Sequence, residues 1–111
     1  MCTVVITLDV ITAVRYYILM IQSFADKDTE KLARMERVSM FVQFERIALT
    51  KLAQLEVSDR LDDLRIPPGN RLEQLKGDRT GQYSIRVNDQ VRICFVWTDQ
   101  GPGNVEICDY H

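Results

Sequence analysis

Basic side chains gather between positions 71 and 97 of this 111-residue chain, and they are its clearest candidates for chemistry. Lysine and arginine stay protonated at neutral pH, and arginine can grip a phosphate with two parallel N–H groups. The basic residues of the stretch outnumber the acidic ones: Arg71, Lys76, Arg79, Arg86 and Arg92 against Glu73, Asp78 and Asp89. This local excess predicts a cationic surface that faces a phosphate backbone.

A glycine-bounded loop lies inside this stretch and reads Gly77-Asp78-Arg79-Thr80-Gly81, directly after Lys76. Together with Lys76 and Arg79, such a loop can cradle a phosphate, although its glycine spacing is not that of a Walker motif. A charged hairpin turn has the same composition. The loop alone therefore leaves both interpretations open.

Two alternating segments, 83–87 and 91–97, follow the loop and predict a β-hairpin that turns at Asn88-Asp89-Gln90. Alternation places the apolar residues on one face of both strands, and Arg86 and Arg92 together on the other. Arg86 is equally explained as a solvated surface residue. Arg92 is a lone charge in an apolar strand, which costs stability unless a partner or a function compensates. We expect helices to cover the apolar face and to leave the arginine face uncovered.

The chain ends in Asp109-Tyr110-His111, after a predicted strand from about Val105 to Cys108 that follows a turn at 100–103. A carboxylate, a phenol and an imidazole can all transfer protons, and imidazole has the best unperturbed pKa for this near neutrality. His111 is the only histidine, so a mechanism with two imidazoles is excluded. Taken alone, the three residues are equally typical of a frayed tail.

Composition sets limits on the kind of site. The formal net charge is −2, so only the local basic patch indicates a nucleic-acid ligand. The three cysteines, Cys2, Cys94 and Cys108, show no CxxC or Cys/His ligand spacing. We therefore expect no zinc site, no disulfide framework and no cofactor, and a protein of the reducing cytoplasm.

The first nineteen residues are apolar but carry Asp9 and Arg15, and they lack the basic start and the cleavage site of a signal peptide. A triplet, Val-Ile-Thr, occurs at 5–7 and again at 10–12. We expect residues 1–19 to be translated upstream DNA, with Met20 as the true start. An additional strand or helix packed on the domain is the alternative.

A short strand at 20–24 and two helices are predicted before the loop. Asp28 is expected to cap a helix from Thr29 to about Met35, and Ser39 to cap a longer helix that ends near Leu55. In the longer helix, apolar residues three or four positions apart form one face that is expected to join the core: Phe41, Phe44, Ala48, Leu52 and Leu55.

A capped helical turn is predicted from Ser58 to Leu64, and Pro67-Pro68 end it because proline cannot continue a helix. Helices that precede most of the strands indicate the α+β class. We expect one domain with an antiparallel sheet and two helices packed on one of its faces.

Several of these motifs occur together in one order: 75–79 reads LKGDR, 81–87 reads GQYSIRV, Trp97 follows, and Asp109-Tyr110-His111 ends the chain. In this combination the chain resembles the HigB toxins of bacterial type II toxin–antitoxin pairs, which belong to the RelE/ParE superfamily. The resemblance spans residues 20–111. It implies a small RelE-like fold with helices on one side and an RNA-binding concave side on the other.

The resemblance also implies a ribosome-dependent endoribonuclease that cuts mRNA in the ribosomal A site, inhibits translation and arrests growth. Its partners would be mRNA, the ribosome and a HigA-like helix-turn-helix antitoxin, through which it would reach operator DNA only indirectly. No membrane association is implied.

The implied chemistry is attack of a ribose 2′-OH on the adjacent phosphate, which needs a base, an acid and charge stabilisation. Lys76 and Arg92 are expected to hold the phosphate, with Arg79 and Arg86 as further RNA contacts. The tail is expected to transfer protons, with Asp109 as base or orienter, Tyr110 as base stack or proton donor, and His111 as acid or phosphate contact.

Glu73 departs from the family pattern, because some members carry a histidine three residues before the motif lysine. A carboxylate can act as a base but repels phosphate, so a weaker activity or a different proton path is expected. The alternative function is a non-catalytic interaction protein on the same fold, either a ParE-like gyrase poison or an attenuated toxin that binds its antitoxin. A nuclease should need the three tail residues, whereas a binding module should tolerate their removal.

Overall fold

A computed structural model describes residues 21–109 of the chain. The predicted extension at 1–19 lies outside these residues, as do Tyr110 and His111 of the predicted site. Two α-helices precede most of the sheet: α2 (Lys27–Ala33) and α3 (Glu45–Val57). The strands are β1 (Glu73–Gln74), β2 (Tyr83–Arg86), β3 (Val91–Thr98) and β4 (Gly101–Asp109), and short 3-10 helices are η1 (Ser39–Phe44), η2 (Leu61–Arg65), η3 (Pro68–Asn70) and η4 (Gly77–Arg79).

The four strands form one sheet in the order β1-β2-β3-β4, and each neighbouring pair is antiparallel. The predicted hairpin is confirmed. Its turn is stabilised by the side-chain carbonyl of Asn88, which accepts hydrogen bonds from the backbone N–H groups of Gln90 and Val91, both at 2.8 Å. The next reversal comes earlier than predicted, since β4 already begins at Gly101 and pairs from there with Thr98.

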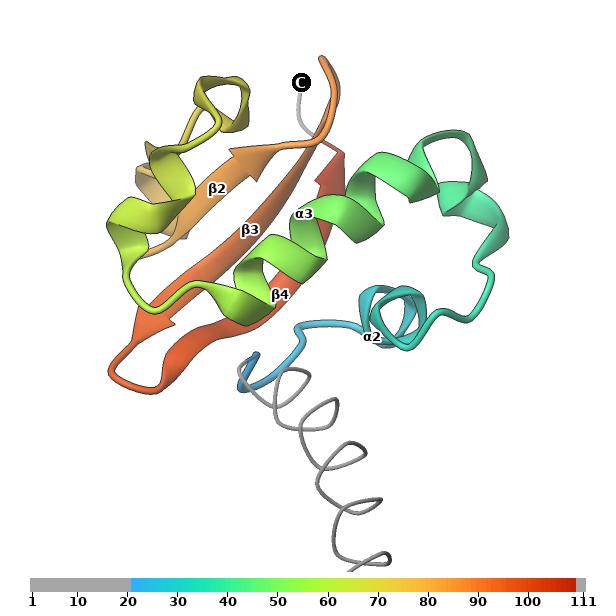
Figure 1. The fold of residues 1–111 in the computed structure, drawn as a ribbon, viewed down its shortest axis with the longest axis horizontal. Helices are drawn as coiled ribbons and strands as arrows, with labels where there is room; N and C mark the ends of the chain where they lie inside the picture. Colours follow the sequence, from blue (N-terminus) through green and yellow to red (C-terminus); the bar gives the residue numbers. More distant parts are fainter. Residues whose placement is uncertain (1–20, 110–111) are drawn as a thin grey trace, which may run out of the picture.

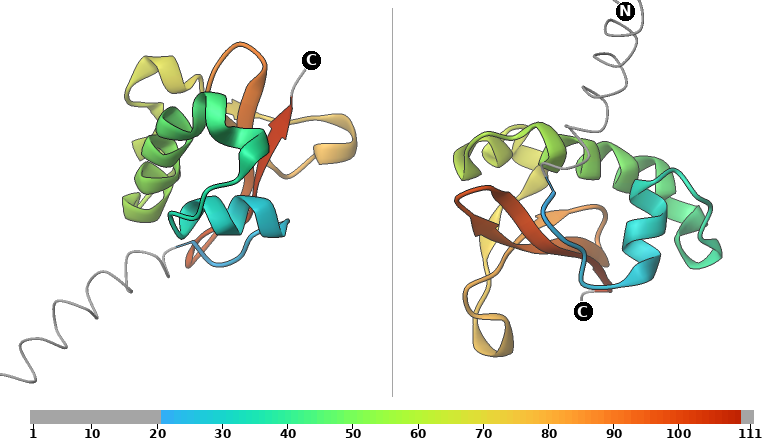
Figure 2. Two further views of the ribbon diagram at one scale, coloured as in Figure 1. Left: turned by 90° about the vertical axis from the view of Figure 1, so that its right-hand side faces the viewer. Right: turned by 90° about the horizontal axis from the view of Figure 1, so that it is seen from below.

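The longer helix packs on one face of the sheet, as Figures 1 and 2 show, and the α+β prediction is confirmed. The predicted apolar stripe lies in this core, with Phe44 partly exposed at its edge. From the sheet, the helix-facing core residues are those of the apolar alternation: Ile85, Val87, Val91, Ile93, Phe95 and Val105. Burial of this stripe and of alternate strand residues fixes the two layers together.

The helix starts differ from the predictions. Asp26, not Asp28, caps α2: one of its carboxylate oxygens accepts the Thr29 backbone N–H at 3.0 Å. The helix therefore runs from Lys27 to Ala33 instead of from Thr29 to Met35. Ser39 caps nothing, because a 3-10 helix from Ser39 to Phe44 precedes α3 and has no side-chain cap.

The predicted strand at 20–24 is reduced to one isolated parallel bridge between Phe24 and Val105. Backbone hydrogen bonds still tie this segment to β4, from Ala25 N–H to the Val105 carbonyl at 2.9 Å and from Val105 N–H to the Ser23 carbonyl at 3.0 Å. In the middle of the sequence, the predicted turn at 58–64 is present as η2, which starts at Leu61.

The sheet face opposite α3, called here the arginine face, is only partly open, although it was predicted to be uncovered. A loop of residues 75–82 leaves β1 and projects on the side of the sheet away from α3 (Figure 2). Leu75, at the start of this loop, packs with Cys94 and Cys108 in a second, small apolar cluster. The arginine face is therefore covered at this cluster.

Candidate functional site

Arg92 lies on the arginine face in the middle of the sheet and is buried, with 8% of its side chain exposed. Its Nε donates to the Ser84 hydroxyl at 2.7 Å, and its Nη2 donates to the Arg71 carbonyl at 2.6 Å. Glu73 lies 3.5 Å from the same Nη2. The cost of a buried charge is thus offset by hydrogen bonds and by one half-exposed carboxylate.

The glycine-bounded loop carries Arg79 back to the sheet. Gly77 and Gly81 have φ angles of 65° and 93°, which L side chains rarely adopt, and these two positions turn the chain around η4. One guanidinium nitrogen of Arg79, Nη1, donates to Gln82 Oε1 at 2.9 Å and to Glu106 Oε1 of β4 at 3.2 Å. The loop is therefore attached to the sheet by a basic side chain.

The other two predicted RNA-binding residues, Arg86 and Lys76, lie at the hairpin and at the start of the loop. Arg86 lies directly across from Arg92 in the β2–β3 ladder and pairs with Asp89 in the hairpin turn. Lys76 is exposed at the start of the loop and borders a hollow of about 450 Å³ together with Glu73, Gln74 and Leu75. Within residues 21–109, it is the only one of the four predicted phosphate contacts without an ion pair.

The two thiols of the small apolar cluster show how close the arginines come to one another. A hydrogen bond between Cys94 and Cys108 lowers the pKa of Cys94 and raises that of Cys108. Arg79 and Arg92 also lower the pKa of Cys94 by their positive charge. Both guanidiniums, predicted from separate motifs, therefore act electrostatically on one thiol of the arginine face.

The tail residue that the structure describes, Asp109, is on the other side of the sheet. It pairs with Val91, a core residue of the helix-facing side, whereas Arg92 pairs with Cys108. Asp109 borders a pocket of about 250 Å³ between η1 and the end of the sheet, together with Phe41 and other apolar residues. It therefore does not join Arg92 and Glu73.

Comparison of the chain with known proteins assigns it to a family. A family model described as the RelE-like toxin of the type II toxin–antitoxin system HigB matches residues 20–111, which is most of the chain. The chain belongs to this HigB-like toxin family. The resemblance found from the motifs is confirmed by this match.

Two curated relatives and one solved structure are similar to this HigB-like chain. Toxin HigB-1 of Vibrio cholerae is 49% identical over 55 residues, which cover 50% of this chain and 58% of the relative. An uncharacterized protein of Haemophilus influenzae is 35% identical over 60 residues, or 54% of this chain and 59% of the relative. The aligned part thus spans less than two thirds of either relative.

The solved structure is the YoeB–YefM complex from Staphylococcus aureus, with a TM-score of 0.53 and 21% identity. The match covers 82% of this chain and 97% of the other. At this identity the similarity establishes the fold alone, and it confirms the predicted RelE-like fold, an antiparallel sheet with two helices.

Sequence reasoning missed two residues of the HigB-like site, Ser84 and Glu106. Both alternate with core residues in their strands, and this alternation puts them on the arginine face. A polar residue there was a signal that the arginines have internal partners. The partners themselves lie eight residues from Arg92 and 27 from Arg79 along the chain, and only the strand register identifies them.

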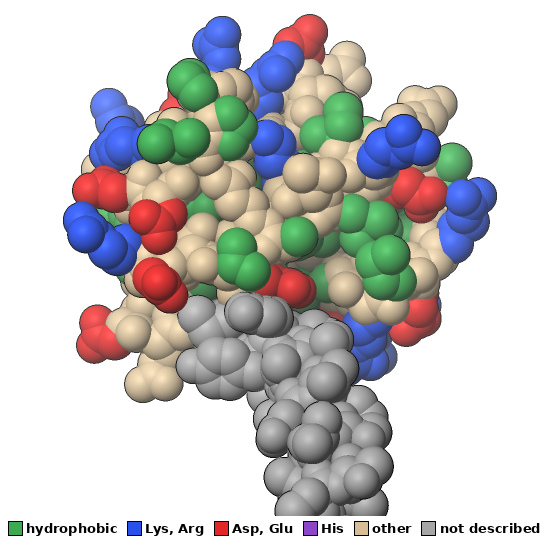
Figure 3. Space-filling model, in the orientation of Figure 1, with side chains coloured by type: hydrophobic (Ala, Val, Ile, Leu, Met, Phe, Trp, Pro, Cys, Tyr) green, Lys and Arg blue, Asp and Glu red, His purple; other side chains and the backbone are tan. Residues whose placement is uncertain are grey.

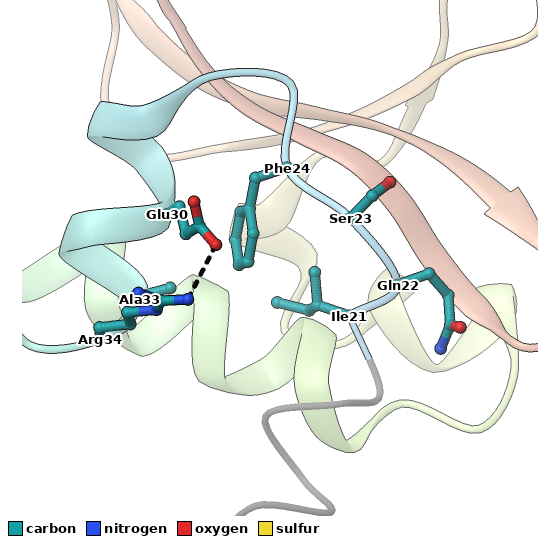
Figure 4. Close-up of a pocket in the computed structure, with 7 residues that line it drawn as sticks. All are labelled: Ile21, Gln22, Ser23, Phe24, Glu30, Ala33 and Arg34. Carbon is teal, nitrogen blue, oxygen red and sulfur yellow. Dashed lines mark hydrogen bonds and ion pairs between the residues drawn. The ribbon is translucent and has the colours of Figure 1, made fainter.

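The helix side of the HigB-like chain shows no comparable concentration of basic side chains. In Figure 3, acidic and basic residues alternate around apolar patches on this face. A pocket of about 360 Å³ beside α2 is bordered by Phe24 and by the Glu30–Arg34 ion pair of 3.1 Å (Figure 4). None of the predicted site residues lines it, so it does not belong to the candidate site.

The part of the chain that the structure describes was searched for metal-binding groups and for membrane-spanning helices. Across residues 21–109, no group of three or more His, Cys, Asp or Glu side chains could hold a metal ion. No helix among those residues is long and apolar enough to cross a membrane.

Proposed function

We propose that this HigB-like toxin is an endoribonuclease that cleaves mRNA in the ribosomal A site. The observation that carries the proposal is the arginine face. Lys76 borders its hollow, Arg79 and Arg92 act electrostatically on Cys94 of the small apolar cluster, and Arg86 lies across from Arg92. Family membership supports it, because the family is one of toxins of type II toxin–antitoxin systems.

The reaction we propose is attack of a ribose 2′-oxygen on the neighbouring phosphorus. A base removes the 2′-proton, the new P–O bond forms, and the bond to the 5′-oxygen breaks. The 5′-oxygen takes a proton from an acid, and a 2′,3′-cyclic phosphate remains. Charge builds up on the non-bridging phosphate oxygens, so fixed cations beside them stabilise the transition state.

Lys76 and Arg92 are the residues we propose for the phosphate. Lys76 is exposed and borders the hollow, where an RNA chain has room to enter. Arg92 is held rigidly by Ser84 and the Arg71 carbonyl, which supports its use as a preorganised charge. Glu73 stands beside Arg92 at 3.5 Å and is half-exposed. A phosphate bound to Arg92 would therefore lie beside Glu73, which already forms an ion pair with the same guanidinium.

Glu73 is also the better candidate for the base. It lies on the arginine face beside Arg92, whereas Asp109 lies on the helix-facing side. We therefore propose Glu73 as base, with Tyr110 and His111 supplying the acid and a phosphate or nucleobase contact.

We further propose that an antitoxin of the HigA-like, helix-turn-helix kind holds this chain. The support is the family, which is defined by toxin–antitoxin systems, and the solved structure of a similar fold, which is a two-protein complex. In this arrangement the toxin would reach operator DNA through its antitoxin.

The test is expression of the full chain with and without Asp109-Tyr110-His111, followed by mapping of mRNA 5′ ends in the cells. A nuclease should produce new ends within translated regions, and the shortened chain should produce none. Loss of one proton-transfer group typically costs about 10²–10⁴ in rate.

Unchanged transcripts during growth arrest by the full chain would exclude the nuclease and favour the interaction protein. The pairing of three of the four cations with carboxylates is the observation that keeps this alternative open. A ParE-like poison should arrest growth equally well without the three tail residues.

A further inference from the structure

Among residues 21–109, Arg79 bonds through only one of its guanidinium nitrogens. Nη1 serves both Gln82 and Glu106, at 2.9 and 3.2 Å, whereas Nε and Nη2 have no partner among residues 21–109. The side chain is 36% exposed. Nε and Nη2 form one edge of the planar guanidinium, which matches two oxygens of a phosphate.

We infer that Glu106 is a positioning residue that aims the free edge of Arg79 at an RNA phosphate. The inference rests on the proposed function and adds a residue to its RNA-binding surface. Glu106 comes from β4 and Arg79 from the loop, so the ion pair attaches the loop to the most extensively paired part of the sheet. The Arg79–Gln82 bond lies within the loop and cannot do this alone.

The loop needs such an attachment because little else fixes it to the sheet. The side chains of Lys76, Asp78 and Thr80 are exposed, and Leu75 is the only loop residue in the small apolar cluster. The hydrogen bonds around η4 connect loop residues with one another, as from the Thr80 hydroxyl to the Gly77 carbonyl at 2.7 Å. The Arg79–Glu106 pair therefore sets where the guanidinium points.

Net charge and positioning predict opposite results when Glu106 is replaced. Removal of a negative charge from a phosphate-binding face should strengthen RNA binding if only the field matters. Loss of a positioning contact should weaken it, because Arg79 must then be ordered at the expense of binding energy. The sign of the change decides between the two.

The experiment compares full-length wild type with Glu106→Ala, Glu106→Gln and Arg79→Ala, and with Arg79→Ala/Glu106→Ala. Asp78→Asn is the matched control, because Asp78 is an exposed carboxylate of the same loop without an ion pair among the described residues. Binding is measured by fluorescence anisotropy of a short labelled single-stranded RNA, and cleavage on ribosomes programmed with a defined mRNA. Amide hydrogen exchange of residues 77–81 reports the loop itself.

We expect Glu106→Ala to weaken RNA binding about tenfold and to raise KM by a similar factor, with kcat nearly unchanged. Glu106→Gln keeps an oxygen acceptor and should recover much of the affinity. Glu106→Ala should add little to Arg79→Ala, because both remove the same contact. Asp78→Asn should bind RNA slightly more tightly, and exchange at 77–81 should be faster in Glu106→Ala.

Tighter RNA binding by Glu106→Ala, or equal losses on the wild-type and Arg79→Ala backgrounds, would overturn the inference. Unchanged exchange at 77–81 would also contradict it, whatever the activity. A wild-type chain that neither binds RNA nor cleaves mRNA would overturn the proposed function instead, and the exchange experiment would still decide whether Glu106 orders the loop.

Discussion

At the scale of single residues, the basic side chains of the arginine face differ in their structural role. Arg92 is almost fully buried and satisfies Ser84 and the Arg71 carbonyl, so it holds strands together as well as presenting a charge. Lys76 is exposed and has no such structural task within the described residues. Substitution of Arg92 should therefore affect the stability of the fold, and substitution of Lys76 should affect RNA binding alone.

Arg92→Ala is expected to lower the free energy of unfolding by about 2–3 kcal/mol, because it leaves buried acceptors without their donor. Lys76→Ala should leave the free energy of unfolding unchanged and still reduce cleavage. Urea denaturation measures the first effect and mRNA cleavage the second. A stable Arg92→Ala variant would mean that Ser84 and Arg71 find other partners.

Glu56 on α3 should make the stability of the protein depend on pH. Burial raises the pKa of its carboxyl from 4.5 to about 6, so the folded chain holds this proton more firmly than the unfolded chain. The stabilisation is complete below pH 4.5 and is lost as the pH rises through about 6. At neutral pH the ionised carboxylate therefore destabilises the fold.

Glu56→Gln is expected to be more stable than wild type at neutral pH, by less than about 1 kcal/mol because the half-exposed group is partly screened. The difference should vanish at pH 4.5. Urea denaturation at both pH values provides the measurement, with Glu36→Gln, an exposed carboxylate, as control. A difference that stays constant with pH would contradict the assignment.

At the scale of elements, a chain of hydrogen bonds joins α2 to the last strand. The buried Thr29 hydroxyl donates to Asp26 Oδ1 at 2.7 Å and accepts the backbone N–H of Ile107 at 3.0 Å. Thr29, whose backbone N–H is capped by Asp26, is thus also the contact to β4. The same network of hydrogen bonds therefore caps α2 and attaches it to the sheet.

Thr29→Val should lower the free energy of unfolding by about 1–3 kcal/mol, because the Ile107 N–H then loses its acceptor in a buried place. Asp26→Ala should cost about 1 kcal/mol as a lost cap. Ser39→Ala should have no effect, since Ser39 makes no capping bond. Thermal or urea denaturation of the three variants tests this order, and an equal loss for Ser39→Ala would contradict it.

At the scale of the whole molecule, the two faces of the sheet have separate tasks. The helix-facing side holds the continuous apolar core and provides stability. The arginine face collects charges over a much smaller apolar cluster. Substitutions on the helix side should therefore change stability alone.

Leu52→Ala is expected to destabilise the fold by about 2–5 kcal/mol, because it opens a cavity where α3 meets the sheet. Leu52 is 1% exposed, and Ile47 on the same helix is 47% exposed. Ile47→Ala should change the free energy of unfolding by less than about 0.5 kcal/mol. Comparable losses for both variants would show that the outer side of α3 is also covered in solution.

The sequence by itself determined those features that depend on local spacing. Alternation in 83–87 and 91–97 predicted which strand residues face the helices, because successive strand side chains point to opposite faces. The three- and four-residue spacing from Phe41 to Leu55 predicted the buried side of α3 in the same way. The face of Ser84 was implicit in the alternation of 83–87.

Only the tertiary structure decided how the charges are paired. Glu73 meets Arg92, and Glu106 meets Arg79, across strand registers that no local pattern specifies. The register of β4 with β3 also showed that Asp109 pairs with Val91, on the helix side. Ion pairs between distant segments depend on which strands become neighbours. Burial of the apolar core determines which strands these are.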